Sequence, residues 1–266
     1  RQRRKTTERM ECNTVDWKQN AQQIREDFDR DGFVILRNYL SPDEVADLEN
    51  NIERYKTEVL PTLPKDAAFY EVRGDTQTIM RLQGMQNHDA YFRDMYDSDR
   101  FLGLAHHLMD GAREGGLQWF NKPAEIGQLT PAHQDGYYFM LEPNEAVTIW
   151  VAIDRADEEN GCVRYVSGSH LKGMRPHQSS DVIGFSQGIT DFGEEDEANE
   201  VAAVVDPGDV ILHHCMIIHR ADPNQSDRSR SALGFVYDAE RAVKDEAKRA
   251  AYQEELKARW KEEGKI

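Results

Sequence analysis

The sequence predicts a mainly β protein with helices before and after the β-rich part. Three observations lead to this prediction: capped amphipathic runs in the first ~110 residues, short β-rich runs between turn residues from about 115 to 237, and a charged tail. Short strands separated by turn signals are typical of a sandwich or a barrel. No repeat or Pro/Gly/Ser-rich linker divides the 266 residues, so we expect one domain.

Within this single domain, residues 1–266, the sequence predicts a helical part at 15–112, a β core at 115–237 and a C-terminal helix at 238–265. The run "SPDEVADLENNIERYKTEV" begins with Ser41 and has Glu44 three residues later, which is a capping box and predicts a helix. A second helix is expected to begin after Ser98. The acidic run "GEEDEANE" (193–200) is interpreted as a solvated loop, with a mobile lid as the alternative.

Composition argues against several classes of partner. The net charge is −16, from 33 basic and 49 acidic residues, which argues against nucleic acid because phosphate binding needs a basic face. No apolar run approaches the roughly 20 residues of a membrane helix. The N-terminal residues are basic without an apolar stretch, unlike a secretory signal. Three widely spaced cysteines favour a reducing compartment, and we expect a cytoplasmic protein.

The segment "GQLTPAHQDGYYFM" contains a His-x-Asp pair, His133 and Asp135. In a strand, residues two apart project to the same face, so this spacing would place an imidazole nitrogen beside a carboxylate oxygen. One such pair is a weak signal for a metal site, and a buried or surface histidine near an aspartate is its common alternative. The two tyrosines that follow, Tyr137 and Tyr138, are candidates for substrate contact or for core packing.

A third metal ligand is expected from the run "DVILHHCMIIHR", which offers three histidines. Interpreted as one strand, the run places His213 and His219 on one face, roughly 20 Å apart, and His214 on the other. Only His219 lies at the end of this strand, where a loop would leave it open to a substrate. His213 is then expected at the barrel end and His214 in an outward or packing position.

Arg230 follows His219 by eleven residues and has two small residues on its own face of the next strand, Ala232 and Gly234. A buried arginine in such a place has room to bind a carboxylate through two parallel hydrogen bonds. Arg228 is a competitor that we expect to be exposed. Two histidines and one carboxylate are the ligand set of non-haem Fe(II) oxygenases, which leave three positions for a 2-oxo acid and O2.

The chain resembles the phytanoyl-CoA dioxygenase family of Fe(II)/2-oxoglutarate oxygenases. The resemblance rests on motifs whose order and spacing agree with those of the family over residues 115–237, and more weakly over residues 27–45. The motifs in the first range are "NKP", "HQDGYYF", "TIWVAID", "ENGCVRYVSGSH", "PGDVILHHCMIIHRADPN" and "RSR". It implies a double-stranded β-helix, the jelly-roll or cupin-like core, with flanking helices. The family's iron ligands match His133, Asp135 and His219, and its 2-oxoglutarate clamp matches Arg230.

The resemblance also suggests residues around the co-substrate. Gln118 and Trp150 fall at positions that line the co-substrate pocket, and Arg81 is the candidate for an upstream basic contact. Ala221 replaces a serine that some relatives use, so that hydrogen bond is missing. No catalytic residue is expected beyond the metal ligands.

The family implies a dioxygenase that uses Fe(II), 2-oxoglutarate and O2, releases succinate and CO2, and hydroxylates a small molecule. The intact Asp135 favours hydroxylation over halogenation. Desaturation or cyclisation by the same iron set, and a non-catalytic jelly-roll binding module, are the alternatives. The identity of the substrate and the oligomeric state are not predicted by the sequence.

Overall fold

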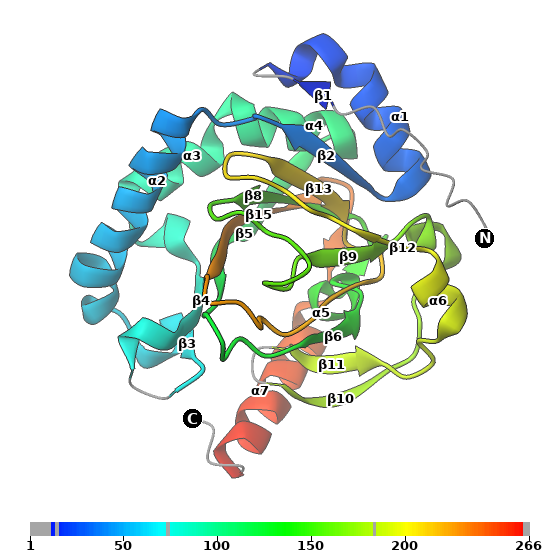
Figure 1. Cartoon of the computed structure of the whole chain (residues 1–266). Coiled ribbons are helices and arrows are strands. Elements are labelled where there is room, and N and C mark those ends of the chain that lie inside the picture. The colour runs from blue at the N-terminus through cyan, green and yellow to red at the C-terminus, as the bar shows by residue number, and fades with distance from the viewer. Residues whose placement is uncertain (1–11, 14–15, 73–74, 183–184, 263–266) are drawn as a thin grey trace, which may run out of the picture.

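The computed structural model describes residues 12–13, 16–72, 75–182 and 185–262. Its centre is formed by two sheets, which Figure 1 shows on opposite sides of the molecule's core. The larger sheet has the order β1 (Cys12–Asn13), β2 (Phe33–Arg37), β13 (Val210–His214), β8 (Ala146–Ala152), β15 (Arg230–Ala239), β5 (Ala112–Lys122), β4 (Ile79–Gln83) and β3 (Ala68–Tyr70).

The smaller sheet faces the larger one across the core (Figure 1). Its four strands, in order, are β12 (Glu200–Ala202), β9 (Val163–Val166), β14 (His219–Ala221) and β6 (Thr130–His133). Two two-stranded sheets complete the β structure: β10 (His177–Val182) with β11 (Phe185–Ile189), and β7 (Leu141–Glu142) with β16 (Val243–Lys244). Among the described strands, β1 pairs with β2 in parallel and the other pairs are antiparallel.

The predicted mainly β architecture with helices is therefore confirmed. The helices are α1 (Ala21–Asp31), α2 (Pro42–Arg54), α3 (Ala90–Asp97), α4 (Leu104–Met109), α5 (Gly136–Phe139), α6 (Glu194–Ala198) and α7 (Glu246–Glu262). The first four lie on the outer side of the larger sheet (Figure 1), where α4 packs on β5, β8 and β15. Short 3₁₀ or π turns occur at Trp17–Asn20, Tyr55–Val59, Leu60–Thr62, Lys65–Ala67, Thr76–Thr78, Met85–Asn87, Asp99–Gly103 and Ser169–Lys172.

Local sequence explains why α2 begins where it does. The Ser41 hydroxyl accepts from the Glu44 backbone N–H, and the Glu44 carboxylate accepts from the Ser41 backbone N–H at 2.8 Å, so the predicted capping box is present. The helix buries Val45, Leu48 and Ile52 at intervals of three and four residues. This apolar stripe packs into the main core.

The central strands of the larger sheet are buried on both faces. Every residue of β8 and β15 is buried: α4 packs on one face of these strands, and the other face is turned toward the smaller sheet (Figure 1). Strand β15 lies between β8 and β5. Arg230, the first residue of β15, is thereby fixed at one end of a strand whose residues are all buried.

Two segments differ from their predictions. The tail continues as a strand to Ala239 and pairs again at β16, so the C-terminal helix begins at Glu246 instead of residue 238. The acidic run at 193–200 contains the short helix α6, whose Asp196 pairs with Arg175 at 3.2 Å.

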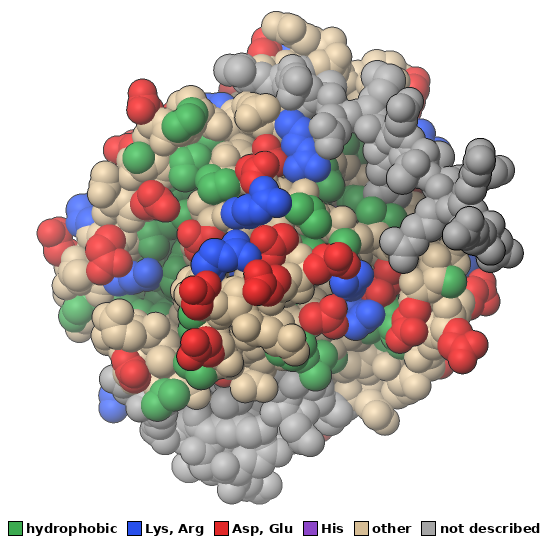
Figure 2. Space-filling model, in the orientation of Figure 1, with side chains coloured by type: hydrophobic (Ala, Val, Ile, Leu, Met, Phe, Trp, Pro, Cys, Tyr) green, Lys and Arg blue, Asp and Glu red, His purple; other side chains and the backbone are tan. Residues whose placement is uncertain are grey.

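On the face drawn in Figure 2, acidic and basic side chains are interleaved over the described surface.

Candidate iron and co-substrate site

The His-x-Asp pair lies at the junction of a strand and a helical turn. His133 is the last residue of β6, and Asp135 precedes α5 with helical φ and ψ of −56° and −33°. The prediction that both residues sit on one strand is therefore wrong. The two side chains nevertheless meet, with 3.4 Å between Nε2 of His133 and Oδ1 of Asp135, because the turn brings the carboxylate back toward the strand end.

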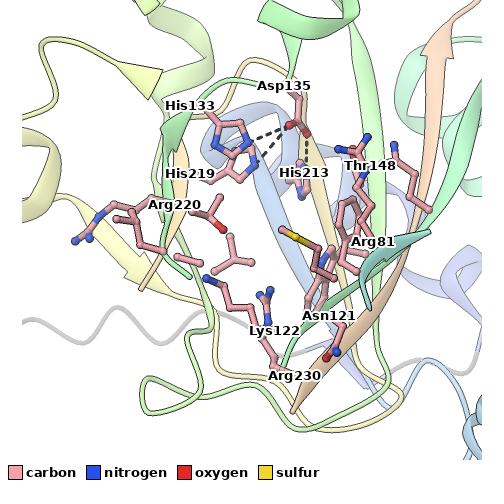
Figure 3. A pocket seen from close by; sticks show the side chains of 18 of the residues that line it. Arg81, Asn121, Lys122, His133, Asp135, Thr148, His213, His219, Arg220 and Arg230 are labelled. Atoms are coloured by element: carbon pink, nitrogen blue, oxygen red, sulfur yellow. Dashed lines mark hydrogen bonds and ion pairs between the residues drawn. The ribbon is translucent and has the colours of Figure 1, made fainter. Parts of the chain in front are cut away.

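His219 reaches the same point from the neighbouring strand. It is the first residue of β14 and is directly opposite His133 in the antiparallel register, which leaves 4.2 Å between the two ring centroids. Its Nε2 lies 3.7 Å from Oδ1 of Asp135. One nitrogen from each histidine and one oxygen of Asp135 lie within 4.8 Å of one another, a group that could hold a metal ion (Figure 3).

Hydrogen bonds fix the orientation of both imidazoles. Nδ1 of His133 donates to the carbonyl of Pro131 at 2.8 Å, and Nδ1 of His219 donates to the carbonyl of Ile217 at 3.0 Å. The Nε2 lone pairs are then left to face Asp135. Burial and the neighbouring His133 lower the pKa of His219 to about 3, so this ring is neutral at pH 7.

The carboxylate of Asp135 is held in its charged form. Burial by itself raises its pKa, but the neighbouring His219, His133 and His213 outweigh burial and hold the pKa well below its usual range. Two neutral imidazoles and one carboxylate are the donor set of a non-haem Fe(II) centre.

The run "DVILHHCMIIHR" does not form one strand, which corrects the expectation about His213. Residues 210–214 belong to the larger sheet and residues 219–221 to the smaller one, with a turn between them. The predicted separation of roughly 20 Å is therefore wrong: the ring centroids of His213 and His219 are 5.0 Å apart. No glycine or proline marks this turn, so the sequence carried no signal for it. His214 packs against Phe28 and His170, as predicted.

A cavity of about 200 Å³ lies between the two sheets and connects the metal-binding group to Arg230. Figure 3 shows His133, Asp135 and His219 on one side of this cavity and Arg230 with Lys122 on the other. Arg230 is 6% exposed, and its Nε has no hydrogen-bond partner among the described residues. Burial lowers the pKa of Arg230 to about 10, so the guanidinium remains charged at pH 7.

Arg228, the competitor, lies outside this cavity. Its guanidinium pairs with Asp157 at 3.0 Å and with Glu159 at 3.2 Å, and its side chain is 41% exposed. These two carboxylates already pair with the guanidinium that a carboxylate of the co-substrate would need. Of the two arginines, only Arg230 is buried and lines the cavity.

Most of the other predicted residues line the same cavity: Arg81, Gln118, Tyr138, Trp150 and Ala221. The Oε1 atom of Gln118 has no hydrogen-bond partner among the described residues. The Trp150 ring lies 5.5 Å from the Arg230 guanidinium, and Arg81 lies beside the rings of Phe69 and Phe120. Tyr137 does not line the cavity, because it stacks on His177 with 4.5 Å between the centroids.

Sequence reasoning missed Lys122 as a cavity residue. It lies directly across from Arg230 in the antiparallel pairing of β15 with β5. Its ammonium donates to the carbonyl of Asp222 at 3.0 Å and to the carbonyl of Gln128. Burial and the neighbouring Arg230 lower the pKa of Lys122 to about 7. Its position depends on the strand register, which no local motif encodes.

Comparison with known proteins identifies the family. The family model "Phytanoyl-CoA dioxygenase (PhyH)" matches residues 28–232. The chain belongs to the phytanoyl-CoA dioxygenase family. Peroxisomal phytanoyl-CoA dioxygenase of Rattus norvegicus is 26% identical over 236 residues, which cover 80% of this chain and 67% of the rat protein. The corresponding share of the Mus musculus protein is 65%, so the chain spans about two thirds of these relatives.

Two solved structures have a fold similar to that of this chain. EvdO2 from Micromonospora carbonacea var. aurantiaca, complexed with 2-oxoglutarate, superposes with a TM-score of 0.68 at 24% identity, covering 88% of this chain and 94% of EvdO2. The epimerase SnoN, in complex with Fe3+, alpha ketoglutarate and nogalamycin RO, gives 0.67 at 22% identity, covering 85% and 86%.

The predicted double-stranded β-helix and the predicted class, Fe(II)/2-oxoglutarate-dependent oxygenase, are thereby confirmed at the level of the family. The predicted cofactors agree with the bound groups of these two structures. No helix among the described residues is long and apolar enough to cross a membrane.

Proposed function

We propose that this phytanoyl-CoA dioxygenase family member is an Fe(II)- and 2-oxoglutarate-dependent dioxygenase that hydroxylates a small molecule. One observation carries the proposal: the three candidate ligand atoms lie within 4.8 Å of one another and face a cavity that also contains a buried arginine. A metal ion by itself would need only the three ligand atoms. A 2-oxo diacid needs the arginine as well, because one end chelates the metal and the other pairs with a cation.

The donors fit iron. His133, Asp135 and His219 would hold it through two neutral imidazoles and one carboxylate, and three positions would remain open. Iron with 2-oxoglutarate and O2 supplies the oxidising power, with release of succinate and CO2. The Nε of Arg230, which lacks a partner among the described residues, supports an anionic group at that end of the cavity.

The chain's own residues would bind and orient the co-substrate and exclude water. Arg230 would pair with the far carboxylate of 2-oxoglutarate, and Trp150 covers the guanidinium from one side. The Oε1 of Gln118, which has no partner in the described part of the chain, can accept a hydrogen bond. Ala221 offers only a methyl group, so the co-substrate carboxylate receives no hydroxyl there. Burial of Arg230, Trp150 and Ala221 would restrict the access of water to this end of the cavity.

The first prediction concerns the co-substrate. With Fe(II) and O2, the protein is expected to convert 2-oxoglutarate to succinate slowly without a substrate and faster when the correct one is present. Succinate is measured by mass spectrometry across a panel of small molecules, with a reaction that lacks the protein as the control. Succinate no higher than in that control, throughout the panel, would contradict the proposed function.

The second prediction concerns the reaction type. Asp135 occupies the position that a halide would need, so chloride or bromide is expected to leave the rate and the product mass unchanged. Product masses are compared with and without each halide at equal ionic strength. A halogenated product from the unaltered protein would show that Asp135 does not keep halide from the metal.

Other outcomes of the same iron chemistry are distinguished by product mass. Two structural neighbours are named as an epimerase, SnoN, and a carbocyclase, SnoK, so related folds carry out more than hydroxylation. A gain of one oxygen in the product indicates hydroxylation, a loss of two hydrogens indicates desaturation or cyclisation, and an unchanged mass indicates epimerisation. A non-catalytic binding module would give none of these products and no succinate.

The cellular setting is part of this proposal. We favour the cytoplasm and one catalytic domain for the whole chain. Cys162 and Cys215 are free and buried, which supports a reducing compartment. The interleaved charges of Figure 2 and the net charge of −16 disfavour nucleic acid as a partner. Cell fractionation with an antibody against the chain tests the compartment, since several curated relatives are named as peroxisomal.

A further inference from the structure

Three buried side chains form a hydrogen-bonded chain that ends on the candidate carboxylate ligand. The Tyr165 hydroxyl lies 2.9 Å from Nδ1 of His213, and Nε2 of His213 lies 3.2 Å from Oδ2 of Asp135. Tyr165 is fully buried and His213 is 4% exposed. Figure 3 shows the contact of His213 with Asp135 beside the two histidines of the metal-binding group.

For a neutral His213, the chemistry of these groups gives each hydrogen bond one direction. A carboxylate only accepts hydrogen bonds, so Nε2–H of His213 must donate to Asp135. A neutral imidazole then presents Nδ1 as an acceptor, and the Tyr165 hydroxyl donates to it. The opposite tautomer would place a nitrogen lone pair against the carboxylate oxygen. Tyr165 therefore selects the tautomer of His213 that holds Asp135.

The two oxygens of Asp135 have different partners. Oδ1 faces Nε2 of His133 at 3.4 Å and Nε2 of His219 at 3.7 Å, whereas Oδ2 faces His213. The group whose ligand atoms lie within 4.8 Å of one another does not include His213. His213 thus contacts one oxygen of Asp135, whereas the nearest contacts of His133 and His219 are with the other.

The local backbone explains why Asp135 needs such support. It lies beyond the end of β6 and before α5, which has four residues, so no sheet register fixes its side chain. His213, in contrast, belongs to a strand paired on both sides, with β2 and with β8. A rigid strand of the larger sheet therefore reaches across to hold a carboxylate on a short turn.

We propose that His213, oriented by Tyr165, is a positioning residue that keeps Asp135 bound to the metal through one oxygen. The inference rests on the proposed function. A carboxylate that bound through both oxygens would occupy one of the three positions that 2-oxoglutarate and O2 require. A hydrogen bond that retains Oδ2 prevents this and fixes the direction of Oδ1.

Two amide variants, each of which replaces one ring nitrogen of His213, separate this role from general packing. In His213→Gln the amide NH2 replaces Nε2–H and reaches Asp135, whereas in His213→Asn the shorter amide replaces Nδ1 and keeps only the contact with Tyr165. We expect His213→Asn to bind Fe(II) about 10- to 100-fold more weakly than the unaltered protein, and His213→Gln to stay within about threefold. The concentration of 2-oxoglutarate that half-develops the visible charge-transfer band is expected to follow the same order.

The control is the adjacent residue, His214, which faces Phe28 and His170. His214→Asn is expected to leave the Fe(II) dissociation constant unchanged, with circular dichroism to verify folding of every variant. Equal Fe(II) binding by His213→Asn and His213→Gln would overturn the inference, as would an equal loss in His214→Asn. Tyr165→Phe leaves His213 in place and is expected to weaken Fe(II) binding about threefold or more; unchanged binding there would also contradict the inference.

The two proposals fail in different ways. If the unaltered protein does not bind Fe(II) or form the band with 2-oxoglutarate, the proposed function is wrong, and so is this inference, which rests on it. If the unaltered protein binds both and the variants match it, only the role of His213 is overturned.

Discussion

His219→Ala is expected to abolish Fe(II) binding and turnover while the fold stays intact. The substitution removes one of the three candidate ligands and leaves only one imidazole and one carboxylate in the group. His219 pairs with His133 across the two strands through the backbone, which alanine preserves. Anaerobic titration with Fe(II) and 2-oxoglutarate, followed by the visible charge-transfer band, measures the loss.

The matched control for this experiment is His214→Ala, five residues earlier and on the far side of β13. His214 touches no atom of the metal-binding group and packs against Phe28 and His170. Its substitution is expected to keep the band and to cost only stability. A band that survives in His219→Ala but disappears in His214→Ala would mean that the third ligand is misassigned.

Arg230→Ala is expected to weaken apparent 2-oxoglutarate binding by roughly 2–4 kcal/mol, because one charge of a buried ion pair is left without its partner. This corresponds to about a 30- to 1,000-fold higher 2-oxoglutarate requirement, since each 1.4 kcal/mol is tenfold. Fe(II) binding without 2-oxoglutarate is expected to change little, because Arg230 lies across the cavity from the metal-binding group (Figure 3).

Arg228→Ala provides the comparison, two residues away in the same segment. Arg228 pairs with Asp157 and Glu159 near the surface, and exposed pairs of this kind contribute little. Its substitution is expected to leave the 2-oxoglutarate requirement unchanged. Both variants are titrated with 2-oxoglutarate against succinate formation, and the reverse pattern would move the clamp to Arg228.

Lys122 sharpens the interpretation of Arg230→Ala. Its ammonium lies in the same end of the cavity but is held by the carbonyls of Gln128 and Asp222. An ammonium restrained in this way cannot replace the two parallel hydrogen bonds of a guanidinium. We therefore expect a large loss in Arg230→Ala despite the neighbouring cation.

The sequence by itself determined the parts of this protein that depend on local patterns. Ser41 and Glu44 form a capping box through backbone groups three residues apart, so no tertiary contact is needed to predict the start of α2. The apolar runs of β8 and β15 have the composition of strands that are buried on both faces. The residue types and spacing of His133, Asp135, His219 and Arg230 suggested the chemistry, and the motifs around them, in order and spacing, suggested the family.

Only the tertiary structure decided how these residues meet. A turn without glycine or proline divides the histidine-rich run between two sheets, and this division brings His213 to Asp135. The register of β14 with β6 sets His219 opposite His133, and that of β15 with β5 sets Arg230 beside Lys122. These partners are about 80 to 110 residues apart in the chain. Their pairing follows from packing one sheet against the other, which no local period in the sequence records.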